Sequence, residues 1–409
     1  MALRTFHIDA FWLRAEPLKR IFAALSEIGD VRVVGGAVRN TLLGQPMGDV
    51  DLATTARPDP VARVLRDAGI KVVETGVEHG TLTAISAGQP FEITTLRRDV
   101  LTDGRRARVV FTEDWEIDAS RRDFTMNALF VDPSGDGYDY VGGYEDCLDR
   151  HVRFIGDPAQ RIVEDYLRIL RLFRIHAAYG RGGLDPIALD AALAHKHGLR
   201  TLSVERIHHE VSRLLVAPGA PVVMDVVADG GFLAPYFVKP LDARTFHAWF
   251  EAETASGRDK AAPLGYAALT GFDPEAFKTL ATRLKFSRKD RDRGLAAMRA
   301  ADDMPPRSVT RARALIYHHG VQAFSDAVIV SLARGVDLLD YTVLLAEARR
   351  FSPPAFPISG YDLMDAGVSG SEIGTRLKRL EQVWIDSDFS LSREALLTYD
   401  REQQTGRSA

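Results

Sequence analysis

Cysteine is almost missing from this chain: Cys147 is the one cysteine among 409 residues. No disulfide can therefore form within the chain, and a zinc or iron–sulfur site built from several cysteines is excluded. A reducing cytoplasm is the compartment that we expect for a chain with this cysteine content.

Long apolar runs are absent as well. No stretch approaches the roughly 18 uncharged apolar residues of a membrane span, and Asp9 and Glu16 interrupt the N-terminal apolar residues in a way that a signal peptide does not. We therefore expect no membrane partner. The dinucleotide fingerprint G-x-G-x-x-G does not follow the first apolar strand, and the P-loop pattern G-x-x-x-x-G-K-[ST] is missing, which argues against both of these nucleotide-binding folds.

An overall excess of positive charge is the third absence, since the formal net charge is −4. Binding to nucleic acid depends on local patches rather than on net charge. Residues 283–313 hold ten Lys or Arg against four Asp, and Ser287 to Asp290 form a capping box that predicts a helix start there. Phosphate contacts are expected from the cations at this helix start, namely Arg288, Lys289 and Arg291.

The stretch Val31–Thr55 carries the clearest chemistry. An apolar strand ends at Gly35-Gly36, a helical turn follows, and Asp49 and Asp51 come next, separated by one apolar residue. On a strand, both carboxylates would point to the same face. Two carboxylates this close repel each other unless a cation lies between them, and Mg²⁺ is a natural partner because it takes its remaining ligands from water and substrate phosphates. Bare backbone N–H groups at the glycine turn suit a triphosphate.

A Gly-Gly pair alone is usually a turn, and a D-x-D pair alone is more often structural than metal-binding. The joint order of strand, Gly-Gly, helix and D-x-D is more specific. It resembles the polymerase-β-like nucleotidyltransferase superfamily, and within it the bacterial class II tRNA nucleotidyltransferases and poly(A) polymerases, whose opening motif is G-G-x-V-R-D-x-L-L-G. Here the motif runs from Gly35 to Gly44 and includes Arg39, with Asn40 where the family commonly has Asp. The resemblance implies that Gly35, Gly36 and Arg39 bind the nucleotide and that Asp49 and Asp51 are the catalytic metal ligands.

Two features follow this motif. Glu92 lies between apolar residues of a predicted strand, so it is either a third acidic group at the metal or an ordinary exposed strand residue. Residues 97–114 have no regular period and predict a flexible loop that could cover the substrate.

A second motif spans residues 118–129 and reads D-A-S-R-R-D-F-T-M-N-A-L. Read alone, it is an amphipathic helix with solvated charges. It resembles the family's R-R-D-F-T-x-N-A-L, which implies that Arg122 contacts nucleotide phosphates or ribose and that Asp123 holds the local geometry, with Asn127 a weaker candidate.

From Gly156 onward the pattern changes to successive helices, the first predicted over residues 161–178. Glu164-Asp165-x-x-Arg168 falls on this predicted helix, and Arg171 and Arg174 continue the face of Arg168. An intrahelical ion pair between Asp165 and Arg168 is one interpretation, worth only about 0.2–0.5 kcal/mol. The other interpretation is base recognition, because an Asp–Arg pair can bond the edges of cytosine and adenine but leaves charged groups unsatisfied against uracil or guanine.

Base recognition is what the resemblance implies for E-D-x-x-R, which makes Asp165, Arg168, Arg171 and Arg174 nucleotide-binding candidates. The segment from Ser203 to Glu210 resembles the family's S-x-E-R-I-x-x-E and would support the same pocket. The glycine-rich tail resembles the C-terminal segment of tRNA nucleotidyltransferases, where Arg376 and Lys378 are candidate RNA contacts.

We expect an α+β fold, with a nucleotidyltransferase head over residues 1–148, a helical neck over 149–218, a helical body over 219–350 and a helical tail over 351–409. The resemblance implies a Mg²⁺-dependent enzyme that adds CMP, CMP and AMP to the tRNA 3′ end from CTP and ATP by a two-metal mechanism. Partial CCA addition and poly(A) synthesis are the alternatives within the family, and an RNA-binding module without activity is the alternative outside it. Nothing in the sequence indicates an obligatory protein partner.

Overall fold

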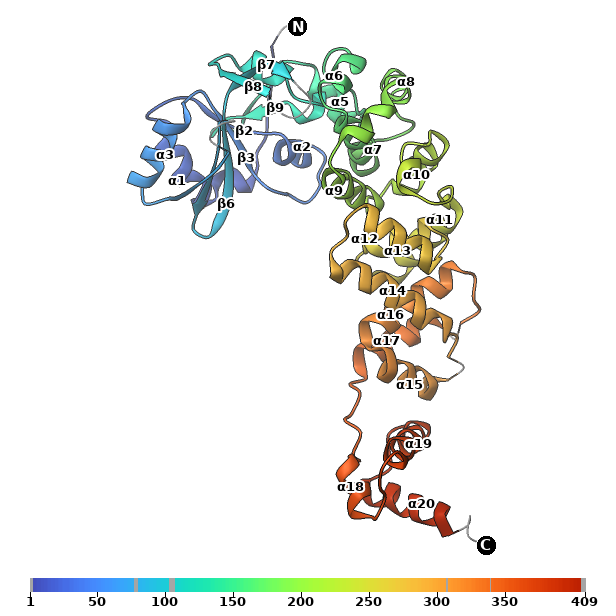
Figure 1. The fold of residues 1–409 in the computed structure, drawn as a ribbon. Helices are drawn as coiled ribbons and strands as arrows, with labels where there is room; N and C mark the ends of the chain where they lie inside the picture. Colours follow the sequence, from blue (N-terminus) through green and yellow to red (C-terminus); the bar gives the residue numbers. More distant parts are fainter. Residues whose placement is uncertain (1–2, 77–79, 103–106, 307, 339, 406–409) are drawn as a thin grey trace. The chain divides into compact units, whose positions relative to one another are not determined.

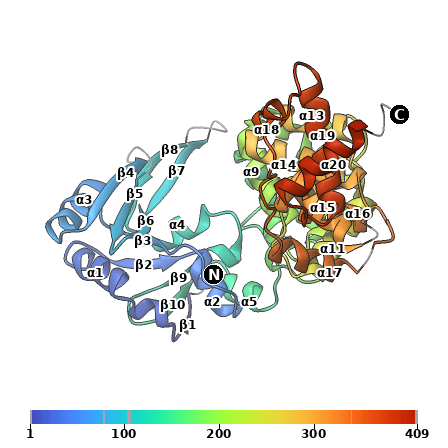
Figure 2. The same ribbon diagram turned by 90° about the horizontal axis from the view of Figure 1, so that it is seen from below.

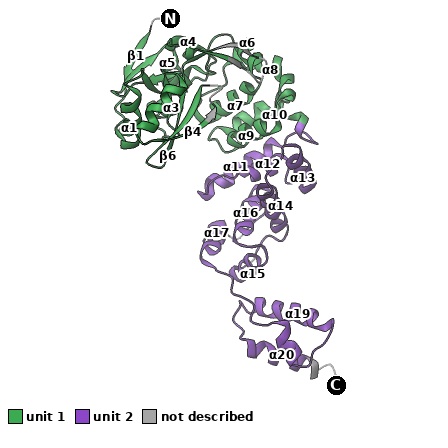
Figure 3. Cartoon of the chain, turned by 60° about the vertical axis from the view of Figure 1, so that its left-hand side comes forward, with its two compact units in different colours: residues 1–235 green, residues 236–409 purple. Residues whose placement is uncertain are grey.

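The computed structural model describes residues 3–76, 80–102, 107–306, 308–338 and 340–405. The chain forms two compact units, residues 1–235 and 236–409, which Figure 3 colours separately. Within the described residues, strands occur only in the first unit and the second unit is helical, so the predicted α+β class is confirmed. The finer division into head, neck, body and tail stays a prediction.

The first unit is built on an 8-stranded sheet in the order β1-β10-β9-β2-β3-β6-β5-β4. Strands β3 and β6 run parallel, whereas the other neighbouring strands are antiparallel. A separate small sheet pairs β7 with β8. The strands are β1 (Arg4–His7), β2 (Val31–Val34), β3 (Asp51–Thr54), β4 (Lys71–Gly76), β5 (Thr81–Ser86), β6 (Gln89–Thr95), β7 (Arg97–Thr102), β8 (Ala107–Phe111), β9 (Leu129–Val131) and β10 (Asp136–Asp139).

Helices α1 (Glu16–Leu25) and α3 (Pro58–Asp67) pack against each other and against β5, and they lie side by side in Figures 1 and 2. Both have proline in their first turn, where its fixed φ and missing N–H fit a helix start.

The remaining helices of the first unit are α2 (Gly36–Leu42), α4 (Trp115–Ser120), α5 (Gly143–Leu148), α6 (Pro158–Glu164), α7 (Leu167–Tyr179), α8 (Pro186–His195), α9 (Val204–Leu215) and α10 (Ala220–Asp229), with short 3₁₀ turns η1 (Phe11–Arg14), η3 (Thr125–Asn127) and η4 (Lys196–Thr201). A further turn, η5 (Ala234–Tyr236), spans the unit boundary in the sequence.

The turn between β2 and α2 requires glycine. Gly35 has φ 80° and ψ −125°, a backbone conformation that a residue with a Cβ rarely adopts. The chain can therefore pass from the buried strand directly into α2, and Gly35 and Gly36 line the adjacent pocket. Beneath the turn, Val34 belongs to a buried cluster with Trp115 and Phe130.

The prediction of an irregular loop over residues 97–114 was wrong. Strand β7 pairs with β8 from Arg97 with Phe111 to Thr102 with Ala107, with a shift of register between Asp99 and Leu101. Asp114 caps the following helix by accepting from the N–H groups of Glu116 and Ile117. The sequence did not reveal this hairpin, because two short strands that pair mainly with each other need no long alternation of apolar and polar residues. The centre of the predicted loop, residues 103–106, lies outside the described residues.

The second unit consists of packed helices with two buried clusters. In the first, the Asp326 carboxylate on α16 accepts hydrogen bonds from Arg258, Arg293 and Gln322. In the second, Trp384 and Leu380 of α19 pack with residues of α18 and α20. The helices are α11 (Ala243–Ser256), α12 (Ala262–Leu269), α13 (Pro274–Arg283), α14 (Arg288–Asp302), α15 (Val309–His319), α16 (Val321–Ala333), α17 (Tyr341–Arg350), α18 (Gly360–Asp365), α19 (Glu372–Asp386) and α20 (Arg393–Thr405).

Candidate active site

A pocket of about 670 Å³ in the first unit takes in every residue that the sequence singled out for catalysis or nucleotide binding, Glu92 excepted. Its walls come from the β2–α2 turn, the start of β3, the segment after α4, and helices α7 and α9. The lining residues are Gly35, Gly36, Arg39, Asn40, Gly48, Asp49, Asp51, Arg122, Asp123, Asn127, Asp165, Arg168, Arg171, Arg174, Ile175, Ala178, Tyr179, Arg213 and Ala217.

Asp49 and Asp51 both line this pocket, but they are not both on a strand. Strand β3 begins at Asp51, so the prediction that one strand carries both carboxylates was wrong, and Asp49 belongs to the preceding segment. In the parallel pairing of β3 with β6, Asp51 lies opposite Glu92. Partial desolvation at the pocket wall, together with the neighbouring charges of Glu92 and Asp49, raises the pKa of Asp51 to about 6 even though the residue still contacts solvent.

The fit of this carboxylate group to Mg²⁺ rests on its donor chemistry. Oxygen ligands from one or two carboxylates, with the rest supplied by water and phosphate, are what Mg²⁺ takes in phosphoryl-transfer sites. In the part of the chain that the structure describes, no three His, Cys, Asp or Glu side chains converge closely enough to form a complete cage. Asp49 and Asp51 thus fit the incomplete set of protein ligands of a Mg²⁺ ion that also binds substrate. A role for Glu92 as a third ligand stays a prediction.

Arg39 is held firmly at the glycine turn. Its Nη1 donates to Asn127 Oδ1 at 2.5 Å, and its Nε and Nη2 donate to Asn40 Oδ1 at 3.2 and 2.9 Å. Its guanidinium also stacks over the Tyr179 ring at 3.7 Å. Asn40 donates in turn to the Pro46 carbonyl at 2.8 Å, so the amide found here in place of the family's carboxylate positions Arg39 without neutralising its charge.

Arg122 lies against a buried carboxylate that the sequence gave no reason to select. Asp118 on α4 is 1% exposed and accepts from Arg122 Nη2 at 2.9 Å and from Arg121 Nε at 2.7 Å. Burial alone would raise the pKa of Asp118, but the two guanidinium groups outweigh it and hold that pKa below its ordinary value. Asp118 therefore remains ionised and fixes Arg122 at the pocket.

Asp123 connects three parts of the site. Its carboxylate accepts from Arg171 Nε at 2.7 Å, from the Phe124 N–H at 2.8 Å and from Asn127 Nδ2 at 3.2 Å. Burial raises its pKa, but the charge and hydrogen bonds of Arg171 dominate and lower it. Through Asn127, Asp123 is also linked to Arg39, in keeping with the predicted role of holding the local geometry.

The prediction of one continuous helix over residues 161–178 was wrong. Helix α6 ends at Glu164, and α7 begins at Leu167. Between them Asp165 is extended, with φ −154° and ψ 104°, and its Oδ1 accepts from the Leu167 N–H at 3.1 Å. Aspartate favours such a terminal position because its short side chain bonds to nearby backbone N–H groups. The period of apolar residues continues through the break, which is why the sequence did not reveal it.

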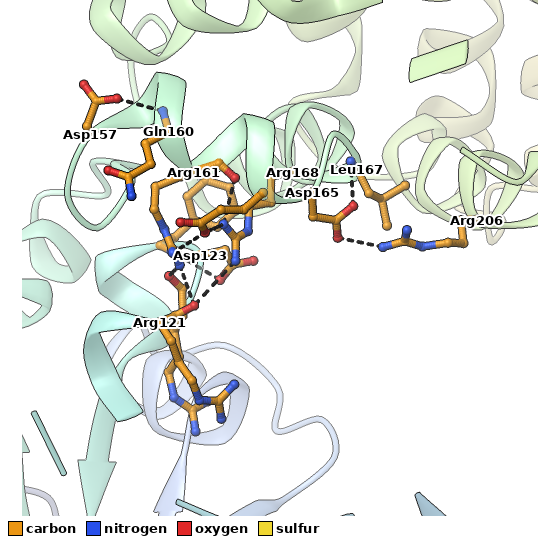
Figure 4. A network of polar contacts seen from close by, with 12 residues as sticks. Arg121, Asp123, Asp157, Gln160, Arg161, Asp165, Leu167, Arg168 and Arg206 are labelled. Atoms are coloured by element: carbon orange, nitrogen blue, oxygen red, sulfur yellow. Dashed lines mark hydrogen bonds and ion pairs between the residues drawn. The ribbon is translucent and has the colours of Figure 1, made fainter. Parts of the chain in front are cut away.

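Asp165 and Arg168 consequently do not form the intrahelical ion pair that was one of the two interpretations. Asp165 Oδ2 accepts from Arg206 Nη2 on α9 at 2.7 Å, whereas Arg168 Nη1 donates to Glu164 Oε2 at 2.6 Å and to the Arg161 carbonyl at 2.7 Å. Figure 4 shows the two side chains close together, each with its own partner. Both still line the pocket, so the structure brings this Asp and Arg together by supporting them separately.

Arg161 links this helix break to the segment that carries Arg122. Its Nη2 donates to the carbonyls of Arg121 and Arg122, and its Nη1 donates to Glu164 Oε2 at 2.5 Å. Arg161 is buried. Glu164, shared between Arg161 and Arg168, therefore ties the candidate base-reading residues to the candidate phosphate-binding segment.

Helix α9 supplies the outer partners of α7. Glu210 Oε2 accepts from Arg174 Nε at 2.5 Å, and its Oε1 lies 3.7 Å from Arg171 Nη1. Arg206 and Glu210 both fall in the segment Ser203–Glu210, which the sequence had assigned to support of the pocket, and the structure confirms that contact. The sequence assigned no individual role to Arg206, Glu164, Asp118 or Tyr179, because the roles of these residues depend on partners distant in sequence.

The candidate RNA contacts of the second unit differ in how exposed their side chains are and in how many carboxylates they contact. The Arg288 side chain is 89% exposed, with Asp292 3.6 Å away, and Arg291 bonds the same Asp292 at 2.8 Å. Arg376 is engaged by Glu372 at 2.8 Å and by Asp400 at 3.2 Å, which leaves it less available for a phosphate. Lys289 and Lys378 are exposed. Their roles in RNA binding remain predictions.

Comparison with known proteins connects this site to a family. A family model described as the poly A polymerase head domain matches residues 31–153. The CCA tRNA nucleotidyltransferase 1, mitochondrial, of Danio rerio is 38% identical over 387 residues, covering 90% of this chain and 86% of the relative. The human protein of the same name is 36% identical, covering 92% and 87%. The CCA-adding enzyme of Geobacillus stearothermophilus is 38% identical, but over 50% of each chain.

Solved structures agree with the sequence relatives. The crystal structure of the Bacillus stearothermophilus CCA-adding enzyme in complex with CTP matches with a TM-score of 0.76 and 25% identity, covering 96% of this chain and 99% of that one. The similarity therefore extends over both units. Because relatives above 30% identity match nearly the whole length, the chain belongs to the family of CCA tRNA nucleotidyltransferases, the CCA-adding enzymes.

Proposed function

We propose that this protein adds CMP, CMP and AMP to the 3′ end of tRNA, using CTP and ATP, releasing pyrophosphate and reading no nucleic-acid template. The observation that carries the proposal is that one pocket contains both the Asp49–Asp51 pair and the Asp165–Arg168 pair. The first pair suits phosphoryl transfer, and the second suits recognition of a base. Relatives named for CCA addition over nine-tenths of the chain support the same reaction.

Base selection follows from hydrogen-bond chemistry. The carboxylate of Asp165 accepts from the exocyclic amino group of cytosine or adenine, while Arg168 donates to the adjacent ring nitrogen. Uracil and guanine present a carbonyl beside an N–H, so each would meet a partner of the wrong kind. A site built this way rejects the wrong base strongly, because bound uracil or guanine would exclude water from these charged groups without satisfying their hydrogen bonds.

At the other end of the pocket, the chain positions and stabilises the reacting phosphates. Arg39 and Arg122 are fixed by their neighbours, and we assign them to the triphosphate together with the backbone N–H groups after Gly35. Fixed donors of this kind stabilise developing charge without reorganising during the reaction. Asp49 and Asp51 would hold two Mg²⁺ ions, which would lower the pKa of the attacking 3′-hydroxyl and neutralise the triphosphate.

Three further assignments belong to the proposal. Membership of the bacterial class II group is supported by the match to the Bacillus stearothermophilus structure. A reducing cytoplasm is supported by Cys147, which is buried and free, whereas three relatives are named mitochondrial. No described helix is long and apolar enough to cross a membrane.

The decisive experiment supplies tRNA that ends before, within or one nucleotide short of CCA, each with CTP alone, ATP alone or both. CCA addition requires CMP incorporation on the shortest tRNA and a single AMP after CC. Repeated AMP addition would instead identify a poly(A) polymerase. Incorporation of AMP without any CMP, or of CMP without any AMP, would identify an enzyme that adds only part of CCA. Absence of any incorporation with Mg²⁺ present would refute the enzymatic assignment and leave an RNA-binding module.

A further inference from the structure

The six arginines that line the pocket differ in what their guanidinium groups contact. Arg39 bonds two asparagine amides. Four others are paired with carboxylates: Arg122, Arg168, Arg171 and Arg174. Arg213 is different, since it is exposed and has no hydrogen bond or ion pair with any residue that the structure describes. The sequence gave no reason to select it.

Arg213 occupies a defined place along α9. It follows Glu210 by three residues and Arg206 by seven, so all three lie on one face of the helix. Glu210 contacts Arg171 and Arg174, and Arg206 contacts Asp165. Arg213 therefore continues the row of α9 side chains that supports the pocket, about 10 Å along the helix from the residue that holds Asp165.

The surroundings of Arg213 leave space for a ligand. The pocket residues contributed by the ends of α7 and α9 are Ile175, Ala178, Tyr179 and Ala217, none of which is an acid. The carboxylates of the pocket are Asp49, Asp51, Asp123 and Asp165, and Asp123 and Asp165 already have arginine partners. Arg213 thus presents a planar donor group whose charge is not balanced by an ion pair.

We propose that Arg213 binds a phosphate group of one of the two reactants in this pocket. Phosphate matches the chemistry, because its oxygens accept two parallel hydrogen bonds from one guanidinium. The phosphate belongs either to the incoming nucleotide or to the 3′-terminal backbone of the RNA. This inference rests on the proposed function, in which both reactants enter the same pocket.

An ordinary surface arginine is the competing explanation, and a matched control separates the two. Arg200, on η4 of the same unit, is also exposed, makes no described ion pair and lies outside the pocket. Arg213→Ala and Arg200→Ala remove the same charge and the same number of atoms. Since both side chains are exposed, neither substitution opens a cavity in the core, and melting curves of the two variants should match.

The experiment measures AMP addition to tRNA that lacks only the terminal A. The KM for ATP is determined at saturating tRNA and the KM for tRNA at saturating ATP, for the wild type, Arg213→Ala, Arg213→Lys and Arg200→Ala. Dissociation constants for ATP and for tRNA are measured separately without turnover. Inorganic tripolyphosphate serves as a competitor that carries phosphate but no base.

If Arg213 binds a phosphate of the nucleotide, Arg213→Ala should raise the KM and Kd for ATP about tenfold, the usual effect of losing a charge-assisted hydrogen bond. The same variant should be inhibited less by tripolyphosphate. If Arg213 binds a phosphate of the RNA, the same variant should show a similar rise in the KM and Kd for tRNA, and its tRNA binding should depend less on salt. Arg213→Lys restores part of the loss in either case. If all constants stay within about twofold of Arg200→Ala, the inference is overturned.

These outcomes distinguish the inference from the proposed function. Wild-type activity with an unaffected Arg213→Ala variant would refute the role of Arg213 alone. A wild type that incorporates no nucleotide would refute the proposed function, and the dissociation constants would still decide whether Arg213 contacts a phosphate.

Discussion

Asp51 and Glu92 lie directly opposite each other on the parallel strands β3 and β6. Parallel neighbours in register turn their side chains to the same face of the sheet. Desolvation is the largest cause of the raised pKa of Asp51, and the repulsion between these two carboxylates adds to it. A cation that bridges Asp51 to a phosphate would reverse this effect.

Asp51→Asn is the first prediction. The substitution keeps the size of the side chain but removes the charge that would bind the metal, so we expect kcat for both CMP and AMP addition to fall by about 10³-fold or more. The measurement is single-turnover incorporation on tRNA lacking CCA. The Kd for tRNA and the melting temperature should stay near wild-type values.

Glu92→Gln calibrates that result. If Glu92 is an ordinary strand residue, its amide variant retains nearly full activity, whereas a third metal ligand would give a loss comparable with Asp51→Asn. Robust CMP addition by Asp51→Asn, at any Mg²⁺ concentration, would contradict the assignment of the metal site.

The second prediction concerns nucleotide choice. Asp165→Ala should lower kcat/KM for CTP and ATP by about 1–3 kcal/mol, the cost of leaving a buried hydrogen-bonding group unsatisfied, and should relax the rejection of UTP. Arg168→Ala should act similarly. Measurement of kcat/KM for CTP, ATP and UTP on matched tRNA ends tests both variants. Unchanged UTP rejection in both would defeat the base-reading role, and a changed Mg²⁺ requirement would show that the substitutions act elsewhere.

The sequence predicted the parts of this site that depend on local order. Gly35, Asp49 and Asp51 were found because strand, turn and helix signals are short-range and the positive φ at Gly35 demands glycine. The residues that the motifs singled out for catalysis or nucleotide binding come from distant parts of the chain and, Glu92 excepted, line one pocket; their roles stay predictions.

What the sequence could not supply was the pairing of charges. The spacing of Asp165 and Arg168 predicted neighbours on one helix, yet the backbone at Asp165 is extended and each residue bonds a different partner. The spacing of apolar residues does not reveal the two-residue break between α6 and α7, because the apolar pattern continues from one helix into the next. Arg213 was missed for a related reason, because an arginine is conspicuous only once its neighbours are seen to be paired.

The third prediction tests the helical second unit through Glu253 on α11. This side chain is 0% exposed, neither oxygen has a hydrogen-bond partner among the described residues, and Arg258 Nε lies 4.0 Å away. Burial, with a smaller contribution from Asp326, raises the pKa of Glu253 from 4.5 to about 7. The folded state therefore binds the proton more tightly than the unfolded state does.

The sign of the pH dependence follows. Stability that depends on Glu253 is fully present below pH 4.5 and is lost as the pH rises to about 7. Glu253→Gln resembles the protonated form, so it should be more stable than the wild type at about pH 8, by roughly 1–3 kcal/mol, and nearly equal to it at about pH 5. Thermal melts should shift by about 2–4 °C per kcal/mol. Glu251→Gln, at an exposed position of the same helix, is the control, and an equal shift in both variants at both pH values would contradict the explanation.

The last prediction concerns Arg206, which bonds Asp165 at 2.7 Å and positions it from outside the pocket. Arg206→Gln should free the carboxylate to rotate, so kcat/KM for CTP and ATP should fall about tenfold while UTP rejection weakens. Arg200→Gln removes the same charge from an exposed position outside the pocket and should change neither quantity. If Arg206 acts through Asp165, the double variant Asp165→Ala with Arg206→Gln should cost no more than Asp165→Ala alone, because the two residues share one interaction. Additive losses in that cycle would mean that Arg206 contacts a reactant itself or supports α9 independently, and the positioning role would be wrong.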